Sequence, residues 1–313
     1  MRVAVVGAGV SGLTCALRLS EAGHDVEVVA AEPPGRTTSA VAAALWYPYR
    51  ALPQDAVTRW AARTFEVLHA LLDEPAAGVR MRAGRELSRT PVPDPWWRDA
   101  VPSLERLTTD RLPDGFVDGF GLTVPVVDTS LHLPWLVERL RTRGVRIRQR
   151  RLARLEDAPA ADVVVDATGL GAAELAGDDT LLPVRGQVVV VRQVGVREWL
   201  LDQTDGAELT YVVPRERTVV LGGTAEVGAT STDTDPLTAE AVLARCTALV
   251  PELAGAEVLE HKAGLRPTRP AVRVEPGVLA DGRPVVHDYG HGGAGVTLSY
   301  GCAEDVVALV AGL

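Results

Sequence analysis

A glycine fingerprint at the start of the chain constrains its fold more than any other feature. A short apolar run, residues 2–6, leads straight into Gly7-Ala8-Gly9-Val10-Ser11-Gly12, which fits the pattern GxGxxG. Gly7 permits a tight turn, Gly9 lets a pyrophosphate approach the backbone, and Gly12 lets the following helix pack closely on the strand. A helical stretch and a second apolar run, residues 25–30, come next. This order predicts a βαβ unit with parallel strands that binds a dinucleotide.

The expected dinucleotide site extends beyond the glycines. Free N–H groups and the dipole at the start of the helix favour the phosphates there. Glu32 is the candidate acid for a ribose hydroxyl, although an exposed loop glutamate would look the same. Arg36 would suit a 2′-phosphate, whereas the run Thr37-Thr38-Ser39 suits the phosphates and ribityl chain of a flavin. The fingerprint alone leaves FAD and NAD open, with a purely structural glycine turn as the remaining alternative.

Composition argues against several other classes of protein. The 313 residues carry a formal net charge of −9, whereas general affinity for nucleic acid needs basic patches that neutralise phosphate. Cys15, Cys246 and Cys302 form neither a CxxC pair nor a Cys/His cluster, so we expect buried thiols and neither a disulfide framework nor a metal site. Apolar runs such as 163–165 are too short to span a bilayer, and no signal peptide is evident. We expect a cytoplasmic protein without a nucleic-acid or membrane partner; a homodimer is compatible with the sequence.

The rest of the chain predicts two interleaved domains. We expect helices over 55–73, over 135–143 and from about 301 to the end, and mostly irregular structure over 88–120. Residues 163–169 are expected to form a buried strand that opens into a turn at Thr168-Gly169, and residues 186–192, 209–213 and 218–222 to form an antiparallel sheet. The predicted fold class is α/β, or α+β overall. A Rossmann-type dinucleotide-binding domain (1–46, 128–182 and 266–313) would be interleaved with a domain built on a mostly antiparallel sheet (47–127 and 183–265).

The C-terminal segment distinguishes between the two cofactors. It reads His287-Asp288-Tyr289-Gly290-His291-Gly292-Gly293-Ala294-Gly295-Val296-Thr297 and continues to Gly301-Cys302-Ala303. This segment resembles the C-terminal signature of the D-amino acid oxidase family, H-N-Y-G-x-G-G-x-G-x5-G-x-A, at every fixed position except Asp288, where asparagine is usual. The resemblance implies FAD as the cofactor. It also implies cofactor contacts from Gly290, Gly292, Gly293, Ala294, Gly295, Val296 and Thr297, with backbone N–H groups facing the pyrimidine end of the flavin.

The resemblance continues through most of the chain. Ala42-Ala43-Ala44-Leu45-Trp46-Tyr47-Pro48-Tyr49 is similar to the family's flavin-contacting segment, with Ala44 in place of a glycine. Arg185-Gly186-Gln187 is similar to its turn into the sheet. Residues 211–214, 221–223 and 264–270 are similar to its substrate-site motifs. The implied cofactor residues therefore also include Ala42, Ala43, Ala44, Leu45, Trp46, Thr168 and Gly169.

The resemblance also assigns a substrate site. Arg266 would grip the substrate carboxylate in bidentate fashion, which orients it better than a lysine would. Tyr211 would donate its hydroxyl to the same carboxylate, although a tyrosine in this strand is otherwise expected in the core. Leu45, Tyr47 and Val213 would line the side-chain pocket, and Gly293 would lie beside the substrate.

The implied reaction is FAD-dependent oxidative deamination of neutral D-amino acids to 2-oxo acids, ammonia and hydrogen peroxide. The substrate α-hydride would pass to flavin N5, and molecular oxygen would reoxidise the cofactor. The D-handedness follows from the resemblance alone. Because hydride transfer needs no protein base, His287 and His291 are expected to hold the flavin turn rather than to move protons.

Three alternatives remain open at this point. A D-aspartate oxidase would need a second cation, for which Arg215 and Arg217 near Tyr211 are candidates. A glycine/sarcosine-type oxidase shares the same chemistry, and a non-catalytic dinucleotide-binding protein is a more distant alternative. Residues 203–208 contain no tyrosine, whereas family members of the animal and yeast kind carry one on a lid. We therefore expect a minimal lid and an open entrance.

Overall fold

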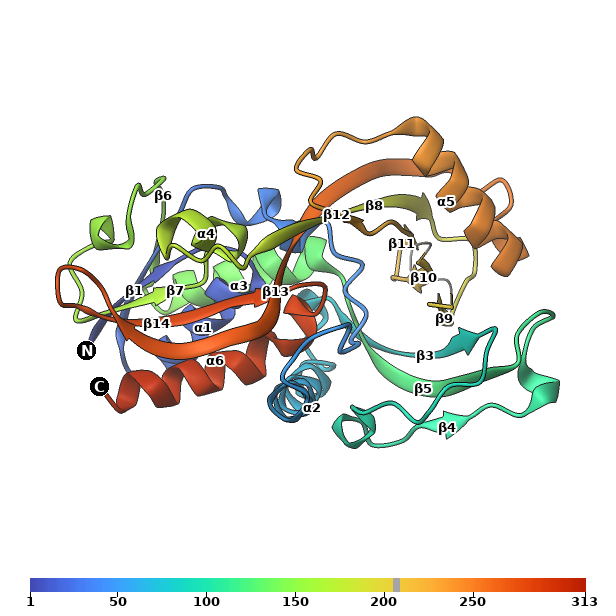
Figure 1. The fold of residues 1–313 in the computed structure, drawn as a ribbon, viewed down its shortest axis with the longest axis horizontal. Coiled ribbons are helices and arrows are strands. Elements are labelled where there is room, and N and C mark those ends of the chain that lie inside the picture. The colour runs from blue at the N-terminus through green and yellow to red at the C-terminus, as the bar shows by residue number, and fades with distance from the viewer. Residues whose placement is uncertain (205–208) are drawn as a thin grey trace.

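The structure is a computed structural model that describes residues 1–204 and 209–313, and one sheet runs through both of its lobes (Figure 1). Among the described residues the sheet has 14 strands, in the order β4-β5-β3-β9-β10-β11-β8-β13-β14-β7-β1-β2-β6, with β12 paired to β8 beside this path. Most of the predicted lid falls on residues 205–208, which lie outside the described residues.

One lobe is built on parallel strands, as the glycine fingerprint predicts. β1 (Arg2–Val6) lies between β2 (Asp25–Ala30) and β7 (Val163–Asp166), and β6 (Arg146–Gln149) and β14 (Pro284–His291) extend this parallel array on its two sides. The strands are rich in valine because both faces of a parallel sheet are covered. The helices of this lobe are α1 (Val10–Glu21), α2 (Gln54–Ala70), α3 (Thr129–Thr142), the short α4 (Ala172–Leu175) and α6 (Gly295–Ala311).

The second lobe is a mostly antiparallel sheet with one helix, α5 (Pro236–Leu249), on one face. Its only parallel pair among the described strands joins β3 to β9. Alternation along the strands separates the two faces: Val212 packs in the cluster beneath α5, whereas Tyr211 and Val213 point to the other side and line a cavity. The strands are β3 (Val79–Ser88), β4 (Glu105–Arg106), β5 (Asp118–Val127), β8 (Leu182–Arg192), β9 (Trp199–Asp202), β10 (Thr210–Pro214), β11 (Thr218–Gly222) and β12 (Glu226–Val227).

A single long strand joins the two lobes. β13 (Val258–Val278) has 21 residues and pairs antiparallel with β8 along its first half and with β14 along its second half. Arg185-Gly186-Gln187 lies inside β8 rather than in a turn, so that expectation was wrong. The reason is that β8 is one long strand paired with β13, β11 and β12.

Two helices begin earlier than the sequence predicted. α3 starts at Thr129 rather than at 135, because Asp128 caps it by accepting a hydrogen bond from Ser130 N (3.0 Å), and Pro134 lies within the helix. α6 starts at Gly295 rather than near 301, directly after the turn that contains Gly292 (φ 55°). The strands predicted at 2–6 and 25–30 are confirmed at their bounds.

The predicted mixed α/β class is confirmed, whereas the domain boundaries stay a prediction. Among the described residues, no helix combines the length and apolarity that a membrane crossing needs.

Candidate active site

A cavity of about 480 Å³ lies at the carboxyl ends of β1, β2 and β7 and continues along β8, β10 and β13. Ligands of open parallel sheets bind at such strand ends. The described residues that form its wall include most of those predicted for the site: Gly7, Ala8, Gly9, Val10, Ser11, Glu32, Arg36, Thr37, Thr38, Ala42, Ala43, Ala44, Leu45, Tyr47, Thr168, Gly169, Tyr211, Val213, Arg266, Gly292, Gly293, Gly295, Val296 and Thr297.

The glycine turn presents the start of α1 to this cavity. Gly7 has a φ of 119°, and a Cβ atom there would come within 2.2 Å of the Ala167 carbonyl oxygen. A Cβ atom on Gly12 would lie 2.1 Å from the Gly7 carbonyl oxygen, so Gly12 allows helix and strand to pack and does not itself line the cavity. Because the first N–H groups of a helix lack partners within it, this end of the cavity suits phosphate oxygens.

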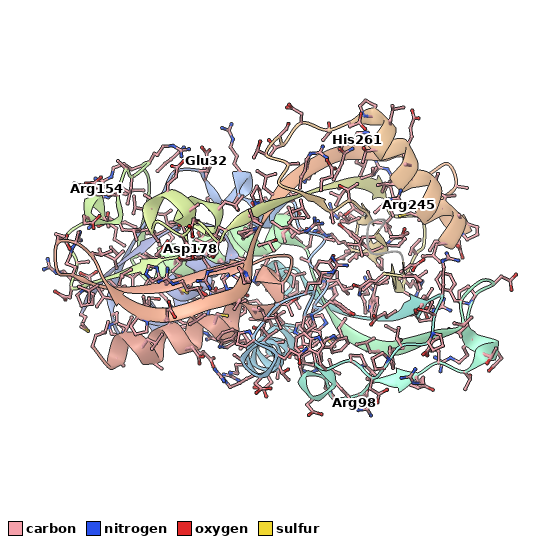
Figure 2. The ribbon with its side chains drawn as sticks, viewed as in Figure 1. Glu32, Arg98, Arg154, Asp178, Arg245 and His261 are labelled. Atoms are coloured by element: carbon pink, nitrogen blue, oxygen red, sulfur yellow. The ribbon has the colours of Figure 1, made fainter. Side chains whose placement is uncertain are left out.

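Polar residues surround the far end of the cavity, beyond β2. Glu32 lies on the same lobe as β1 (Figure 2), and its side chain is 45% exposed, with Oε1 3.5 Å from Arg151 Nη2. The Thr38 hydroxyl donates to the Leu265 carbonyl oxygen (3.0 Å), which ties this loop to β13. Ser39 Oγ accepts from Val10 N (3.0 Å), so the loop also contacts the start of α1.

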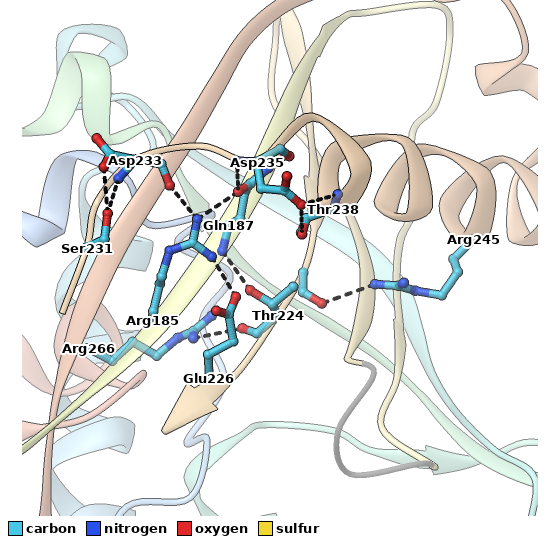
Figure 3. A network of polar contacts seen from close by, with 11 residues as sticks. Arg185, Gln187, Thr224, Glu226, Ser231, Asp233, Asp235, Thr238, Arg245 and Arg266 are labelled. Carbon is cyan, nitrogen blue, oxygen red and sulfur yellow. Dashed lines mark hydrogen bonds and ion pairs between the residues drawn. The ribbon is translucent and has the colours of Figure 1, made fainter. Parts of the chain in front are cut away.

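Arg266 enters the cavity from β13 at the opposite end. Its Nη1 donates to the Thr224 carbonyl oxygen (3.0 Å), and Thr224 Oγ1 accepts in turn from Gln187 N (3.0 Å), as Figure 3 shows. A guanidinium carries five N–H donors in a planar fork, so further donors remain for a ligand carboxylate. The network fixes one edge of the guanidinium and leaves it able to bind a carboxylate.

Tyr211 lies close to Arg266. Its ring packs on Gly222 of the neighbouring strand, where a Cβ atom would come within 2.0 Å of Tyr211 Cζ. Burial raises the pKa of Tyr211, and the nearby Arg266 cation only partly opposes this. The hydroxyl therefore stays protonated at neutral pH and can donate a hydrogen bond.

Apolar side chains line the cavity beside this pair. Leu45, Tyr47 and Val213 are there as predicted, although Tyr47 is held by polar contacts: its backbone N–H donates to Thr297 Oγ1 (3.0 Å) and its hydroxyl accepts from Gln203 Nε2 (2.9 Å). The wall residues beside this pair that were not predicted from the sequence include Tyr49, Val188, Leu201 and Leu209. Side chains alternate between the two faces of a strand, so Val188 lies on the same face as Gly186, and Leu209 on the same face as Tyr211. This alternation could have identified Val188 and Leu209 as wall residues from the sequence.

Each of the two C-terminal histidines pairs with an aspartate. His287 Nδ1 lies 3.0 Å from Asp166 Oδ2, and this histidine belongs to β14 rather than to the flavin turn expected for it. His291 lines the cavity, with Nε2 3.1 Å from Asp288 Oδ1. Each imidazole is thus held by a fully buried carboxylate.

Tertiary structure also forms a Cys/His cluster that the sequence spacing did not predict. Asp288, His291 and Cys302 offer ligand atoms within 4.8 Å of one another, and Cys15 Sγ donates to Asp288 Oδ2 (3.1 Å). Burial, with a smaller contribution from Asp288, raises the pKa of the Cys15 thiol well above its usual value. The cluster arises because α1 and α6 pack together beside β14, which brings together residues far apart in sequence.

Three further residues predicted to contact the cofactor do not line the cavity. Trp46 is fully buried, with its indole N–H donated to the Ala61 carbonyl oxygen (3.0 Å). The side chain of Arg269 covers Gly290, where a Cβ atom would meet Arg269 Cβ at 2.9 Å. Ala294 is fully buried at the N-cap of α6. In each case packing within the protein occupies the space that a ligand would need.

Arg215, Arg217 and Arg269 do not line the cavity. Arg215 is buried, lies 3.3 Å from Asp128 Oδ1 and donates to the Ala42 carbonyl oxygen (2.8 Å). Arg217 is exposed. Arg269 pairs with Asp178 (2.8 Å), on the lobe that holds β14 (Figure 2).

Comparison with known proteins agrees with this geometry. The family model described as FAD-dependent oxidoreductase matches residues 2–309. The chain is 52% identical to a D-amino-acid oxidase of Rubrobacter xylanophilus over 98% of this chain and 95% of that protein. It is 46% identical to a D-amino-acid oxidase of Streptomyces coelicolor over 98% and 96% of the two chains. Its fold is similar to that of glycine oxidase from Bacillus cereus, with a TM-score of 0.83 and 21% identity over 99% and 95% of the two chains.

The family match confirms the expected cofactor, because the matching model describes FAD-dependent enzymes. It covers nearly the whole chain, both lobes included, and the two oxidases match over the same extent. The chain therefore belongs to the DAO family of FAD-dependent oxidoreductases.

Proposed function

We propose that the protein oxidises neutral D-amino acids to 2-oxo acids, ammonia and hydrogen peroxide, with molecular oxygen as the final acceptor. The observation that carries the proposal is the pairing of Arg266 with Tyr211 at one end of a cavity whose other end is a dinucleotide turn. The names of the relatives at 52% and 46% identity support the same substrate class.

The cavity fits FAD by the chemistry of its wall. N–H groups at the start of α1 suit the pyrophosphate, Glu32 suits a ribose hydroxyl, and Thr297 and the glycines before it suit the isoalloxazine. When bound, FAD supplies the hydride acceptor, at N5. We assign cofactor binding to residues 1–46, 128–182 and 266–313, and substrate binding to 47–127 and 183–265. The cytoplasmic location and a homodimer stay predictions.

The residues of the chain orient the substrate and leave proton chemistry to water and the substrate amine. Arg266 binds both carboxylate oxygens, and the Tyr211 hydroxyl donates to one of them. These contacts fix the substrate Cα relative to the flavin, which is the main contribution a positioning site makes to the rate. Leu45, Val213 and Leu201 exclude water from the side chain.

A D-aspartate oxidase is the nearest alternative, and the chain is 37% identical to such an enzyme from Homo sapiens over 99% of this chain and 94% of that one. An acidic side chain would need a second cation beside Arg266. Arg215 is held by Asp128 and the Ala42 carbonyl oxygen, and Arg217 is exposed, so neither supplies one. These positions favour a neutral substrate.

The test is oxidation by the purified yellow protein. We expect the flavin absorbance to bleach anaerobically with D-alanine and not with L-alanine, and peroxide to form in air. Protein that cannot be reconstituted with FAD, or that bleaches with D-aspartate in preference to D-alanine, would refute the proposal.

A further inference from the structure

Four side chains of the kinds that bind metal ions meet beside the cavity. Cys15 comes from α1, Asp288 and His291 come from β14, and Cys302 comes from α6. The Cys302 sulfur, a carboxylate oxygen of Asp288 and a ring nitrogen of His291 all lie within 4.8 Å of one another. Cys15 Sγ lies 3.1 Å from Asp288 Oδ2, whereas His291 Nε2 lies 3.1 Å from Oδ1. The carboxylate therefore stands between a thiol and an imidazole.

The cluster is closed to solvent and centred on an anion. Cys15, Asp288 and Cys302 are fully buried, and His291 is nearly so. Among the described residues, Asp288 forms no ion pair with an arginine or a lysine, and its one charged partner is His291. A buried carboxylate is costly unless a cation compensates it. A divalent ion held by these four side chains supplies that compensation.

The sequence carries a second sign at the same place. Asp288 is the one fixed position at which the C-terminal segment departs from the signature of the D-amino acid oxidase family, where asparagine is usual. Asparagine offers a neutral amide oxygen, whereas aspartate offers an anionic oxygen that binds a cation more strongly. The structure places this departure at the centre of the cluster.

Two thiols, an imidazole and a carboxylate form a donor set that suits zinc. A closed zinc site has four ligands, at about 2.3 Å for sulfur and about 2.0 Å for nitrogen or oxygen, so its ligand atoms lie about 3.3–3.8 Å apart. Small side-chain rotations bring the present cluster to this spacing. Burial raises the pKa of the Cys15 and Cys302 thiols well above its usual value. Because cysteine binds zinc as thiolate, the ion displaces both thiol protons, which pass to solvent.

We propose that Cys15, Asp288, His291 and Cys302 form a structural zinc site that links α1, β14 and α6. The spacing of the cysteines along the chain predicts no such site, because it does not show that α1 and α6 pack together beside one strand. α1 follows the glycine turn, and α6 follows the turn at Gly292, so the ion ties together two parts of the cofactor cavity. The site does not depend on which amino acid the enzyme oxidises.

The test is the zinc content of the untagged, FAD-bound enzyme, produced in zinc-supplemented medium and dialysed against a weak zinc chelator. We expect about one zinc ion per chain by elemental mass spectrometry. Loss of a residue that merely supports a ligand costs about 10–100-fold in metal affinity, so Asp288→Asn and Cys302→Ser should each lower the zinc content at least tenfold.

The matched control is Cys246→Ser. Cys246 is the third buried cysteine, and it lies in the apolar cluster beneath α5. This variant should keep the zinc content of the wild type. Flavin content shows whether each variant is folded. Zinc that is absent from the wild type, or that persists in flavin-bound Asp288→Asn and Cys302→Ser, would overturn the proposal.

Cobalt provides a readout that needs no variant. Wild-type enzyme produced with cobalt in place of zinc should show the d–d absorption bands of a tetrahedral thiolate site, at wavelengths longer than those of the flavin. If neither variant folds, this spectrum decides the question: the bands support the zinc site, and their absence from the FAD-bound wild type rejects it.

Discussion

The guanidinium of Arg266 lies over Gly186 of the neighbouring strand, so closely that a Cβ atom at position 186 would come within 2.4 Å of both Nη1 and Nη2. The two residues belong to β13 and β8, which pair along the junction of the lobes. Glycine at 186 therefore provides the space in which the proposed carboxylate clamp sits.

Gly186→Ala should displace the clamp without removing it. Because a Cβ atom cannot move away from the backbone, the guanidinium must shift, and we expect the KM for D-alanine to rise about tenfold or more, a cost of about 1–2 kcal/mol. Steady-state kinetics with flavin content measured in parallel check this. Gly312→Ala, where a Cβ atom would make only ordinary contacts at 3.5 Å and beyond, is the control. An unchanged KM for Gly186→Ala would show that the guanidinium is not confined as described.

Arg266→Ala tests the clamp itself. Removing one partner of a buried charged pair costs about 2–5 kcal/mol, so KM for D-alanine should rise about 100-fold while flavin stays bound. Arg266→Lys keeps the charge without the planar fork of donors, so its KM should lie between those of the wild type and Arg266→Ala. Substitution of the exposed Arg217 by alanine should leave KM as it is. A KM unchanged in Arg266→Ala would reject the clamp.

Gly301→Ala should destabilise the fold. A Cβ atom at 301 would come within 2.3 Å of the Trp60 carbonyl oxygen, at the contact between α2 and α6. The helices must move apart, so we expect a loss of about 1–3 kcal/mol in the free energy of unfolding. Urea unfolding of the FAD-bound protein measures it, and Gly312→Ala at the end of the same helix should cost far less. Equal midpoints for the two variants would contradict the packing.

His132 should make stability depend on pH. Its Nδ1 lies 2.8 Å from the Ala77 carbonyl oxygen and must carry the proton, so Nε2 accepts from the Tyr300 hydroxyl (3.2 Å). Burial lowers the pKa of His132 from 6.5 to about 4, against the opposing effect of the Ala77 hydrogen bond. Between these values the unfolded chain binds more protons, so stability falls as the pH falls from about 6.5 to 4, by up to about 3 kcal/mol.

Urea midpoints across this pH range measure the effect. His132→Gln should show a shallower pH dependence between pH 4 and 6.5 than the wild type, whereas substitution of the exposed His69 by glutamine should not. The same slope in all three proteins would mean that another group is responsible.

Glu86 should lower stability as the pH rises, whereas His132 lowers it as the pH falls. Burial raises the pKa of Glu86, on β3, from 4.5 to about 6, against the opposing effect of the nearby Tyr47 hydroxyl. The folded state then binds more protons between these values, so the contribution of Glu86 is lost as the pH rises through about 6. Glu86→Gln should therefore be more stable than the wild type by about 1–2 kcal/mol at pH 7.5, and this gain should disappear below about pH 4.5. A difference that does not vary with pH would contradict burial of the carboxylate.

Most of the cofactor half of the protein could be predicted from its sequence. Residues 2–30 predicted the parallel unit at its bounds, because the strand, glycine turn and helix are set by contacts between neighbours in the chain. The segment His287–Ala303 predicted FAD, and most of the predicted wall residues line the cavity for the same reason: they belong to short motifs whose backbone shape is local.

The sequence named residues of the substrate half, but their arrangement in space follows only from the tertiary structure. The closeness of Arg266 to Gly186, the row from Tyr211 through Leu201 to Glu86, and the meeting of Cys15 with Asp288 all depend on strand register or helix packing between segments far apart in the chain. Periodicity shows which face a residue occupies and not which residue of a distant strand lies opposite it. That choice is made by the packing of the whole sheet.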